Sequence, residues 1–348
     1  MVQRGPSLAA EITDLYAFPS PEHPGHLSLA LGVLPPAPVD ACFSQDVLYR
    51  FRLRPVTIGG WQARTSFPLG PEEDEIVVTC SFDAPRAGQE GTCTTSDGQS
   101  ARFVVGAEAG GRADGLRVFA GRRSHPSGTR GSNLLSIVVE IDCLPWLLQG
   151  KGPLFAVAAE TVAAGGLPIR INRMGRPEIK DTILSMKEFD EVNRDLEVRD
   201  LYNLEDPFHM SREYRDVYRA RFNANLPVFD RIDATIDWLI GPGGEHPLTD
   251  LLLADHLIVD VTKPYATDSF FEIERATLEA RVHTTCGGRS LNDDVSETLF
   301  SLYVCGLSGR RLNPGVQRAT VPASDWFPYL AQADEPEGAS RFRRASSA

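Results

Sequence analysis

The segment DVLYRFRLR, residues 46 to 54, alternates apolar and polar side chains and is the clearest guide to the fold. One face would carry Val47, Tyr49, Phe51 and Leu53. The other face would carry Leu48, Arg50, Arg52 and Arg54. Successive side chains of a strand point to opposite faces, so a period of two is typical of a strand with one buried face. The segment therefore predicts a half-buried β-strand.

Further segments on either side have the same strand-like character. They are LSLALGVL (27–34), EIVVTCSF (75–82), ARFVVG (101–106), LRVFAG (116–121), LLSIVVEID (134–142) and LFAVAAETV (154–162). Glycine, proline, aspartate and serine separate these short runs, as turns separate antiparallel strands. We expect a mainly β (β-rich α+β) fold, with antiparallel sheets packed as a sandwich or an irregular propeller-like body rather than a doubly wound sheet.

The pattern changes near residue 180, where helical features begin. Asp181 is a suitable N-cap for DTILSMKEFDEVNRDLE, and Ser211 is one for a second helix. In that second helix an apolar stripe would comprise Tyr214, Val217, Tyr218 and Phe222. ATIDWLI (234–240) and HPLTDLLLAD (246–255) predict shorter helices. We expect a helical insertion over about 180–256.

Strand character returns after this insertion. LIVDV (257–261) and TLFSLYVCG (298–306) predict strands, whereas FFEIERATLEARV (270–282) fits either a strand or a helix. We expect residues 1–333 to form a single β-rich domain. The polar end of the chain, residues 334–348, is expected to be a disordered tail.

Composition excludes several classes of protein. The chain of 348 residues has a net charge of -12, which disfavours binding to a phosphate backbone, so no nucleic-acid partner is expected. No apolar run is long enough for a membrane span or a typical secretory signal, so we expect no membrane association and a cytoplasmic location. The six cysteines are widely spaced without a CxxC pair and are expected to be reduced. Composition does not indicate an oligomeric state.

Nucleotide and hydrolase signatures are also absent. No GxxxxGK[ST] occurs, no GxGxxG follows a strand, and neither GxSxG nor HExxH is present. The glycine-rich stretch 84–131 favours long hairpins and loops instead. We therefore expect no nucleotide cofactor.

The stretch HTTCGGRSLNDDV, residues 283–295, has the richest chemistry of the chain. His283 could act as a base, Arg289 could hold an anion, and Asp293 or Asp294 could exchange protons. The alternative is a structural turn, in which the aspartates bond the local backbone and the arginine bridges to a carboxylate. Asp293 and Asp294 are adjacent, so in an extended segment they would point to opposite faces and not act as one pair.

Two other segments could contribute to a site. FAGRRSHPSG (119–128) places Arg122, Arg123 and His125 after a strand and in a loop, where they could bind a carboxylate or phosphate. An ordinary solvated basic loop is the alternative.

The second is DLYAFPSPEHPGH (14–26), which supplies Asp14, His23 and His26. Histidines three residues apart can bind a metal, but no third ligand lies at a diagnostic spacing, so we expect no metal. Asp255, His256 and Asp260 resemble a catalytic pairing, but their apolar flanks favour the end of a helix leading into a buried strand.

Several of these segments together resemble a bacterial family known as domain of unknown function 4331. The similar segments are ITDLYAFPSP, DVLYRFRL, LRVFAGRR, GRPEIKDTIL, LLLADHLIVDVTKP, CGGRSLNDDV and FPYLAQ, in order over residues 10 to 332. The resemblance implies no settled activity. It also implies an Asp-Asp-Pro-Phe segment after the arginine of the FAG motif, where this chain has Ser124-His125-Pro126-Ser127. Exported members of the family are expected to carry a Ser-Ser-His segment near the start, and this chain lacks it. These departures indicate a changed role if either region forms the family's site.

Two functions remain open on these grounds. One is a cofactor-free enzyme that acts on a small molecule by acid–base chemistry, possibly in a specialised metabolic pathway. Its catalytic residues would be His283, Asp293 and His125, and its substrate-binding residues Arg289, Arg122, Asp14 and Asp294. The other is a non-catalytic ligand-binding or scaffold protein. Convergence of these side chains on one pocket would favour the enzyme.

Overall fold

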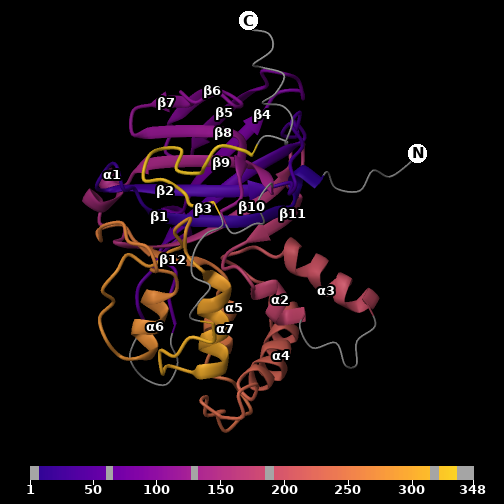
Figure 1. The fold of residues 1–348 in the computed structure, drawn as a ribbon, viewed down its shortest axis with the longest axis vertical. Helices are drawn as coiled ribbons and strands as arrows, with labels where there is room; N and C mark the ends of the chain where they lie inside the picture. The colour runs from indigo at the N-terminus through magenta and orange to yellow at the C-terminus, as the bar shows by residue number, and fades with distance from the viewer. Residues whose placement is uncertain (1–7, 60–65, 127–131, 185–191, 314–320, 335–348) are drawn as a thin grey trace, which may run out of the picture.

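The computed structural model describes residues 8–59, 66–126, 132–184, 192–313 and 321–334 (Figure 1). The strands are β1 (Ile12–Pro19), β2 (His26–Val33), β3 (Val47–Pro55), β4 (Ile76–Phe82), β5 (Glu90–Thr95), β6 (Ser100–Val104), β7 (Gly111–Ala113), β8 (Leu116–Ser124), β9 (Asn133–Asp142), β10 (Leu154–Ala163), β11 (Arg170–Met174) and β12 (Leu257–Asp260). The helices are α1 (Leu144–Leu148), α2 (Ile179–Leu184), α3 (Val192–Leu204), α4 (Arg212–Phe229), α5 (Thr249–Leu253), α6 (Glu272–Leu278) and α7 (Val295–Cys305).

The strands form two antiparallel sheets, which confirms the expected β-rich fold. One sheet has five strands in the order β1-β2-β9-β8-β7. The other has seven, in the order β11-β10-β3-β4-β5-β6, with β12 paired to β10. Every pairing between these strands is antiparallel.

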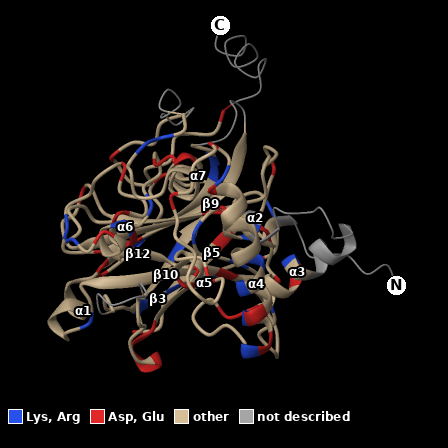
Figure 2. Cartoon of the chain, turned by 90° about the horizontal axis from the view of Figure 1, so that it is seen from below, with Lys and Arg blue, Asp and Glu red and all other residues tan. Residues whose placement is uncertain are grey.

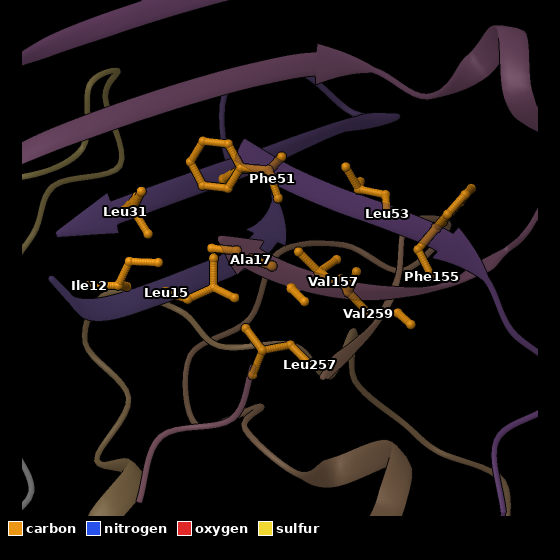
Figure 3. Close-up of a cluster of buried hydrophobic side chains, with 14 of the residues drawn as sticks. Ile12, Leu15, Ala17, Leu31, Phe51, Leu53, Phe155, Val157, Leu257 and Val259 are labelled. Carbon is orange, nitrogen blue, oxygen red and sulfur yellow. The ribbon is translucent and has the colours of Figure 1, made fainter. Parts of the chain in front are cut away.

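The main hydrophobic core includes side chains from both sheets. The apolar face of β3 is fully buried there, as the period-two pattern of residues 46–54 requires. Figure 3 shows Leu15 and Leu31 of the five-stranded sheet in the same cluster as Phe51 and Val157 of the seven-stranded sheet. The sheets therefore pack as two layers around a shared core, which favours a sandwich over a propeller.

The C-terminal residues cover the opposite face of the five-stranded sheet. A second apolar cluster there joins Phe18, Phe119 and Val138 to Tyr329 and Leu330. The backbone N–H of Ser124 also donates to the carbonyl of Ala331 at 3.1 Å. This segment crosses the sheet in yellow in Figure 1.

Helices α2 to α7 lie below the sheets in Figure 1, whereas the short α1 lies beside them. Helices α2 to α5 fall within the predicted insertion, but α6 and α7 come from later in the chain. Several predicted details need correction. Asp181 is not an N-cap, because α2 begins at Ile179. Residues 185–191 of the same predicted helix, and 335–348 of the predicted tail, lie outside the described part.

The segment 298–306 is not a strand, as the sequence predicted, but part of helix α7. Its mostly apolar residues, interrupted by Ser301, fit a buried strand and a buried helix equally, so the ends of the element decide between the two. The side chain of Asp294 accepts a hydrogen bond from the N–H of Glu297, and Gly306 ends the helix at φ 59°. Conversely, 234–240 is not helical, because Asp230 accepts hydrogen bonds from the N–H groups of Asp237 and Trp238 instead.

Four strands were not predicted, namely β1, β5, β7 and β11. In addition, β8 continues to Ser124, so Arg122 and Arg123 lie in a strand and not in a loop. Pairing with β9 keeps this end of β8 extended, from Arg122 opposite Leu135 to Ser124 opposite Asn133. In α4, the buried side chains include Tyr218 and Phe222, whereas Val217 of the predicted stripe is exposed.

Candidate functional site

Residues 286–290, CGGRS, connect the two sheets, and we call them the clasp. On one side Arg289 exchanges backbone hydrogen bonds of 2.8 and 3.1 Å with Ala17 of β1. On the other side Gly288 donates to the carbonyl of Ile258 in β12, and Asp260 donates to the carbonyl of Cys286. β1 and β12 belong to different sheets, so the clasp joins the sheets by main-chain bonds.

The two glycines of the clasp are required by the space around them. Both have positive φ, +63° at Gly287 and +68° at Gly288. A Cβ at Gly288 would lie 2.2 Å from the carbonyl oxygen of Ala17, and one at Gly287 would lie 2.5 Å from Ile273. The Gly-Gly pair therefore serves close packing between backbones rather than the approach of a ligand.

Three of the predicted site residues are in contact at the clasp, namely Arg289, which belongs to it, and Asp14 and His125. Arg289 donates to Asp14 Oδ1 at 2.9 Å and to the carbonyl of Leu15 at 3.1 Å, and it lies over the ring of Tyr16. His125 Nε2 lies 2.8 Å from the other oxygen of Asp14. Burial by itself raises the pKa of Asp14, but the charge of Arg289 and the contact with His125 bring it below its ordinary value. Asp14 is thus a buried carboxylate held by two partners.

The two adjacent aspartates have separate structural roles. Asp293 accepts from the N–H and hydroxyl of Ser290, both at 2.8 Å, and from the N–H of Asp268 at 2.7 Å. Burial raises its pKa above the ordinary value. Asp294 caps α7. The expectation that they do not act as one pair agrees with these contacts.

The remaining predicted residues lie apart from this group. His283 Nε2 contacts Asp260 at 2.8 Å. Arg122 donates to the carbonyls of Ala37 and Asp334, so it fastens the C-terminal segment. Arg123 pairs with Glu108 at 2.7 Å. Asp14, His125 and Arg289 therefore form one group, with Asp293 in the neighbouring turn, whereas His283, Arg122 and Asp294 have other partners.

A cleft that the sequence did not predict lies on the outer face of the seven-stranded sheet. It encloses roughly 290 Å³, and we call it the arginine cleft. Its lining residues are Arg50, Arg52, Glu75, Val77, Glu160, Val162, Pro168, Arg170 and Asp206. The sheet register creates it, because Glu160 of β10 lies opposite Arg50 of β3 and Val162 lies opposite Arg170 of β11.

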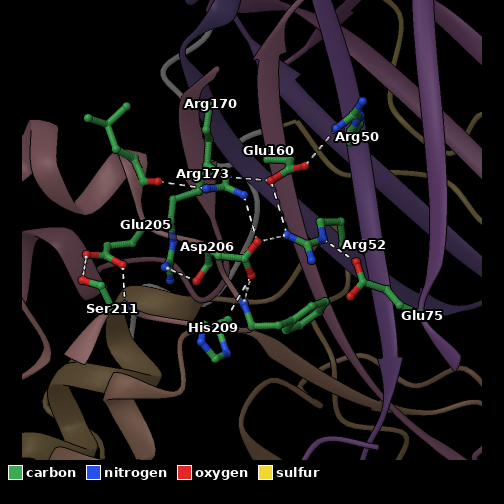
Figure 4. Close-up of polar contacts among 12 residues, drawn as sticks. Arg50, Arg52, Glu75, Glu160, Arg170, Arg173, Glu205, Asp206, His209 and Ser211 are labelled. Atoms are coloured by element: carbon green, nitrogen blue, oxygen red, sulfur yellow. Dashed lines mark hydrogen bonds and ion pairs between the residues drawn. The ribbon is translucent and has the colours of Figure 1, made fainter. Parts of the chain in front are cut away.

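Ion pairs fix most charged side chains of the arginine cleft (Figure 4). Arg170 contacts Glu160 at 2.7 Å and Asp206 at 2.9 Å. Arg52 contacts Asp206 and Glu75, each at 2.5 Å. Burial alone would lower the pKa of Arg52, but the two carboxylates raise it above the ordinary value. Burial alone would raise the pKa of Asp206, but Arg52 brings it below the ordinary value. Arg52 and Asp206 are therefore both held in their charged forms.

Arg50 is the exception in the arginine cleft. Its contact with Glu160 is 3.5 Å long, which is an ion pair but a poor hydrogen bond. Its Nε is buried and has no hydrogen-bond partner in the described part of the chain. The alternating arginines of residues 46–54 were the available signal, but they were interpreted as an ordinary solvent face. Figure 2 shows positions of basic and acidic residues interspersed along the ribbon.

A second group of polar residues lies on the outer face of the five-stranded sheet. His23, His26 and Glu140 each offer a ligand atom, and these atoms lie within 4.8 Å of one another. Glu140 lies 117 residues along the chain from His23, so sequence spacing could not indicate it as the third ligand. Burial raises the pKa of Glu140, but Tyr329, Ser20 and Arg117 bring it below its ordinary value.

No protein-family model matches this chain, and no curated protein or solved structure is significantly similar to it. The resemblance to domain of unknown function 4331 therefore stays a prediction that rests on the quoted motifs. Among the helices that the structure describes, none is both long and apolar enough to cross a membrane.

Proposed function

We propose that this protein binds a small organic anion in the arginine cleft. The observation that carries the proposal is Arg50, whose buried Nε lacks a hydrogen-bond partner in the described residues. A buried donor without a partner costs about 1–3 kcal/mol, and a carboxylate or phosphate oxygen would satisfy it once the Arg50 side chain, which Glu160 holds only at 3.5 Å, turns into the cleft.

The local charge also supports an anionic ligand. The lining itself is balanced, with Arg50, Arg52 and Arg170 against Glu75, Glu160 and Asp206. Arg54, which pairs with Glu75 from outside the lining, adds a fourth positive charge. One positive charge is in excess, although the whole chain carries -12. The volume of roughly 290 Å³ is near the lower end of the ~300–1,000 Å³ of small-molecule sites, so a ligand of metabolite size fits.

The electrostatics favour binding over acid–base catalysis in the arginine cleft. The pKa of Arg52 is raised and that of Asp206 is lowered, so both groups stay charged at neutral pH. A general acid or base works best with a pKa near the working pH. The proposal therefore follows the non-catalytic alternative. It also places the protein in the cytoplasm, where its six unpaired cysteines would stay reduced.

An acid–base enzyme is the second candidate function. The observation that favours it is the pair formed by His125 and Asp14, because a carboxylate at 2.8 Å orients an imidazole as in many catalytic sites. The side chain of His125 is 16% exposed, so a small substrate could reach only its edge.

Calorimetric titration tests the binding proposal. Inorganic phosphate and succinate are titrated separately into the full chain and into Arg50→Ala. We expect at least one probe to bind and the variant to weaken it by about 10- to 100-fold, which corresponds to the ~1.5–3 kcal/mol of a hydrogen bond to a charged group. The two probes distinguish a phosphate site from a carboxylate site.

Arg86→Ala is the matched control, because Arg86 is an exposed arginine that pairs only loosely, at 3.9 Å, with Glu90. It removes the same charge from another part of the surface, so we expect unchanged affinity. Equal weakening in both variants would indicate a general charge effect. Such equal weakening would contradict the proposal, and so would a titration in which neither phosphate nor succinate binds.

A further inference from the structure

The strand register brings His23, His26 and Glu140 together although they are distant in sequence. His26 opens β2, and Ser28, two residues further on, lies opposite Glu140 of β9. Residues two apart share a face, so His26 and Glu140 project from the same side of the sheet. His23 lies in the hairpin before β2, where its N–H donates to the hydroxyl of Ser20 at 3.0 Å.

The distances within this group fit a metal ion. Nδ1 of His23 lies 2.8 Å from Oε1 of Glu140, and Nδ1 of His26 lies 3.9 Å from the same oxygen. Ligand atoms at ~2.0–2.1 Å from a tetrahedral ion are about 3.3 Å apart. Small side-chain rotations would therefore bring the three atoms around one ion. We propose that His23, His26 and Glu140 bind one divalent first-row metal ion, for which zinc is the suitable probe.

The surroundings of Glu140 orient it for this role. Its second oxygen accepts hydrogen bonds from the hydroxyls of Ser20, at 2.7 Å, and Tyr329. Only the first oxygen faces the histidines. Partners of this kind, which hold a ligand side chain without touching the ion, are usual around protein metal sites.

Arg117 indicates that a cation belongs at this position. Its Nη1 donates to Nδ1 of His23 and to Oε1 of Glu140, each at 3.1 Å. Arginine can only donate, so this contact is a hydrogen bond in the tautomer of His23 whose Nδ1 carries no proton, which is the form that can bind a metal. In that tautomer Nδ1 of His23 and Oε1 of Glu140, 2.8 Å apart, both present lone pairs to the guanidinium group, whereas in the other tautomer Nδ1 donates to Oε1.

A metal ion can take the place of that guanidinium group. Arg117 has two other partners toward which it would turn, the carboxylate of Glu22, which the same Nη1 contacts at 3.0 Å, and the ring of Phe327 at 4.3 Å. The side chain of His23 is 47% exposed, so the bound ion would also face solvent. A position open to solvent distinguishes catalytic from structural zinc sites.

Metal titration of the full chain tests this proposal independently of the arginine cleft. Every protein in this titration also carries Cys42→Ser, because Cys42 is the one cysteine of six that is not buried and its thiol could bind zinc elsewhere. After treatment with a chelator, zinc is titrated by calorimetry, and cobalt(II) is titrated by its visible absorption. We expect one equivalent to bind, and His23→Ala and His26→Ala each to lower the affinity at least about 100-fold, since even indirect partners of a metal are worth ~10–100-fold.

His209→Ala is the matched control, because His209 is exposed and lies outside the group. Thermal melting without metal verifies that each variant is folded. Arg117→Gln gives a second readout, since removal of the competing cation should tighten zinc binding about tenfold or more. The proposal is overturned if His23→Ala and His26→Ala bind zinc as His209→Ala does, if Arg117→Gln weakens binding, or if the chain binds no zinc.

Discussion

At the scale of single residues, Gly288 shows how a short motif can serve the fold rather than chemistry. Its N–H bonds to one sheet, while the missing Cβ leaves room for the carbonyl of Ala17 in the other. The same stretch contains a histidine, a cysteine and two aspartates, which suggested a reactive site. Burial raises the pKa of the Cys286 thiol, so this cysteine is not poised as a nucleophile.

Gly288→Ala should destabilise the protein strongly. The new methyl group would meet the oxygen of Ala17 at 2.2 Å, and the backbone at φ +68° is itself unfavourable for alanine by about 1–2 kcal/mol. We expect a loss of at least about 3 kcal/mol in the free energy of unfolding, measured by urea denaturation. Gly243→Ala is the control, because nothing lies within 4 Å of its added Cβ. Equal stability of the two variants would disprove the packing role.

At the scale of elements, α7 illustrates why an apolar run leaves the type of element undecided. Its buried side chains include Val295, Leu299, Leu302 and Tyr303, at helical spacing, but from Leu299 to Cys305 every residue except Ser301 is apolar. The alternation that marks a half-buried strand is therefore missing, and so is a polar helical face. The cap at Asp294 was visible in the sequence, but it was interpreted as a site residue.

Asp294→Ala should weaken α7. Loss of an N-cap costs about 0.5–2 kcal/mol, and the hydrogen bond at stake is the 3.0 Å contact with the N–H of Glu297. The expected result is a lower melting temperature, measured by circular dichroism. Asp294→Ser retains a capping oxygen and should recover most of the loss. If both substitutions lower the melting temperature equally, the cap is not what stabilises the helix.

At the scale of the whole molecule, the clasp and the C-terminal segment hold distant parts of the chain together. The clasp joins β1 to β12, and the C-terminal segment covers the outer face of the five-stranded sheet. Arg289 reinforces the first connection, because its guanidinium group is buried against Asp14 and the carbonyl of Leu15.

Arg289→Ala should destabilise the whole fold by about 3–5 kcal/mol, because it leaves the Asp14 carboxylate buried without its main partner. The double variant Asp14→Asn/Arg289→Met, which leaves no unpaired charge, should be closer to the natural protein in urea denaturation. If the single variant is as stable as the natural protein, the pair does not support the fold.

The pH dependence follows from the same pair. The pKa of Asp14 is lowered in the folded state, so its contribution to stability is present above its ordinary value of 3.8 and is lost as pH falls below that value. The difference in stability between the natural protein and the double variant should therefore shrink on acidification. A constant difference from neutral pH to pH 3 would contradict this assignment.

Much of the β-rich architecture could be predicted from sequence because it rests on local periodicity. The alternation in residues 46–54 determined one buried face of β3 and also marked β4, whereas short apolar runs between turn residues marked β2, β6, β8, β9 and β10. β1 was missed, since almost all its residues are buried and its pattern does not alternate. Of the predicted site residues, Asp14, His125 and Arg289 proved to be neighbours, but no local rule could indicate that.

The sequence by itself determined that β3 is a strand with one apolar face and indicated antiparallel sheets, and the Gly-Gly pair showed where unusual backbone angles are permitted. Only the tertiary structure decided that α7 is a helix, that the clasp joins two sheets, and that Glu140 lies beside His23 and His26. The reason is that periodicity reports contacts between residues close together in the chain. Ion pairs, close backbone packing and ligand clusters depend instead on strand register between distant segments, such as His23 and Glu140, which are 117 residues apart.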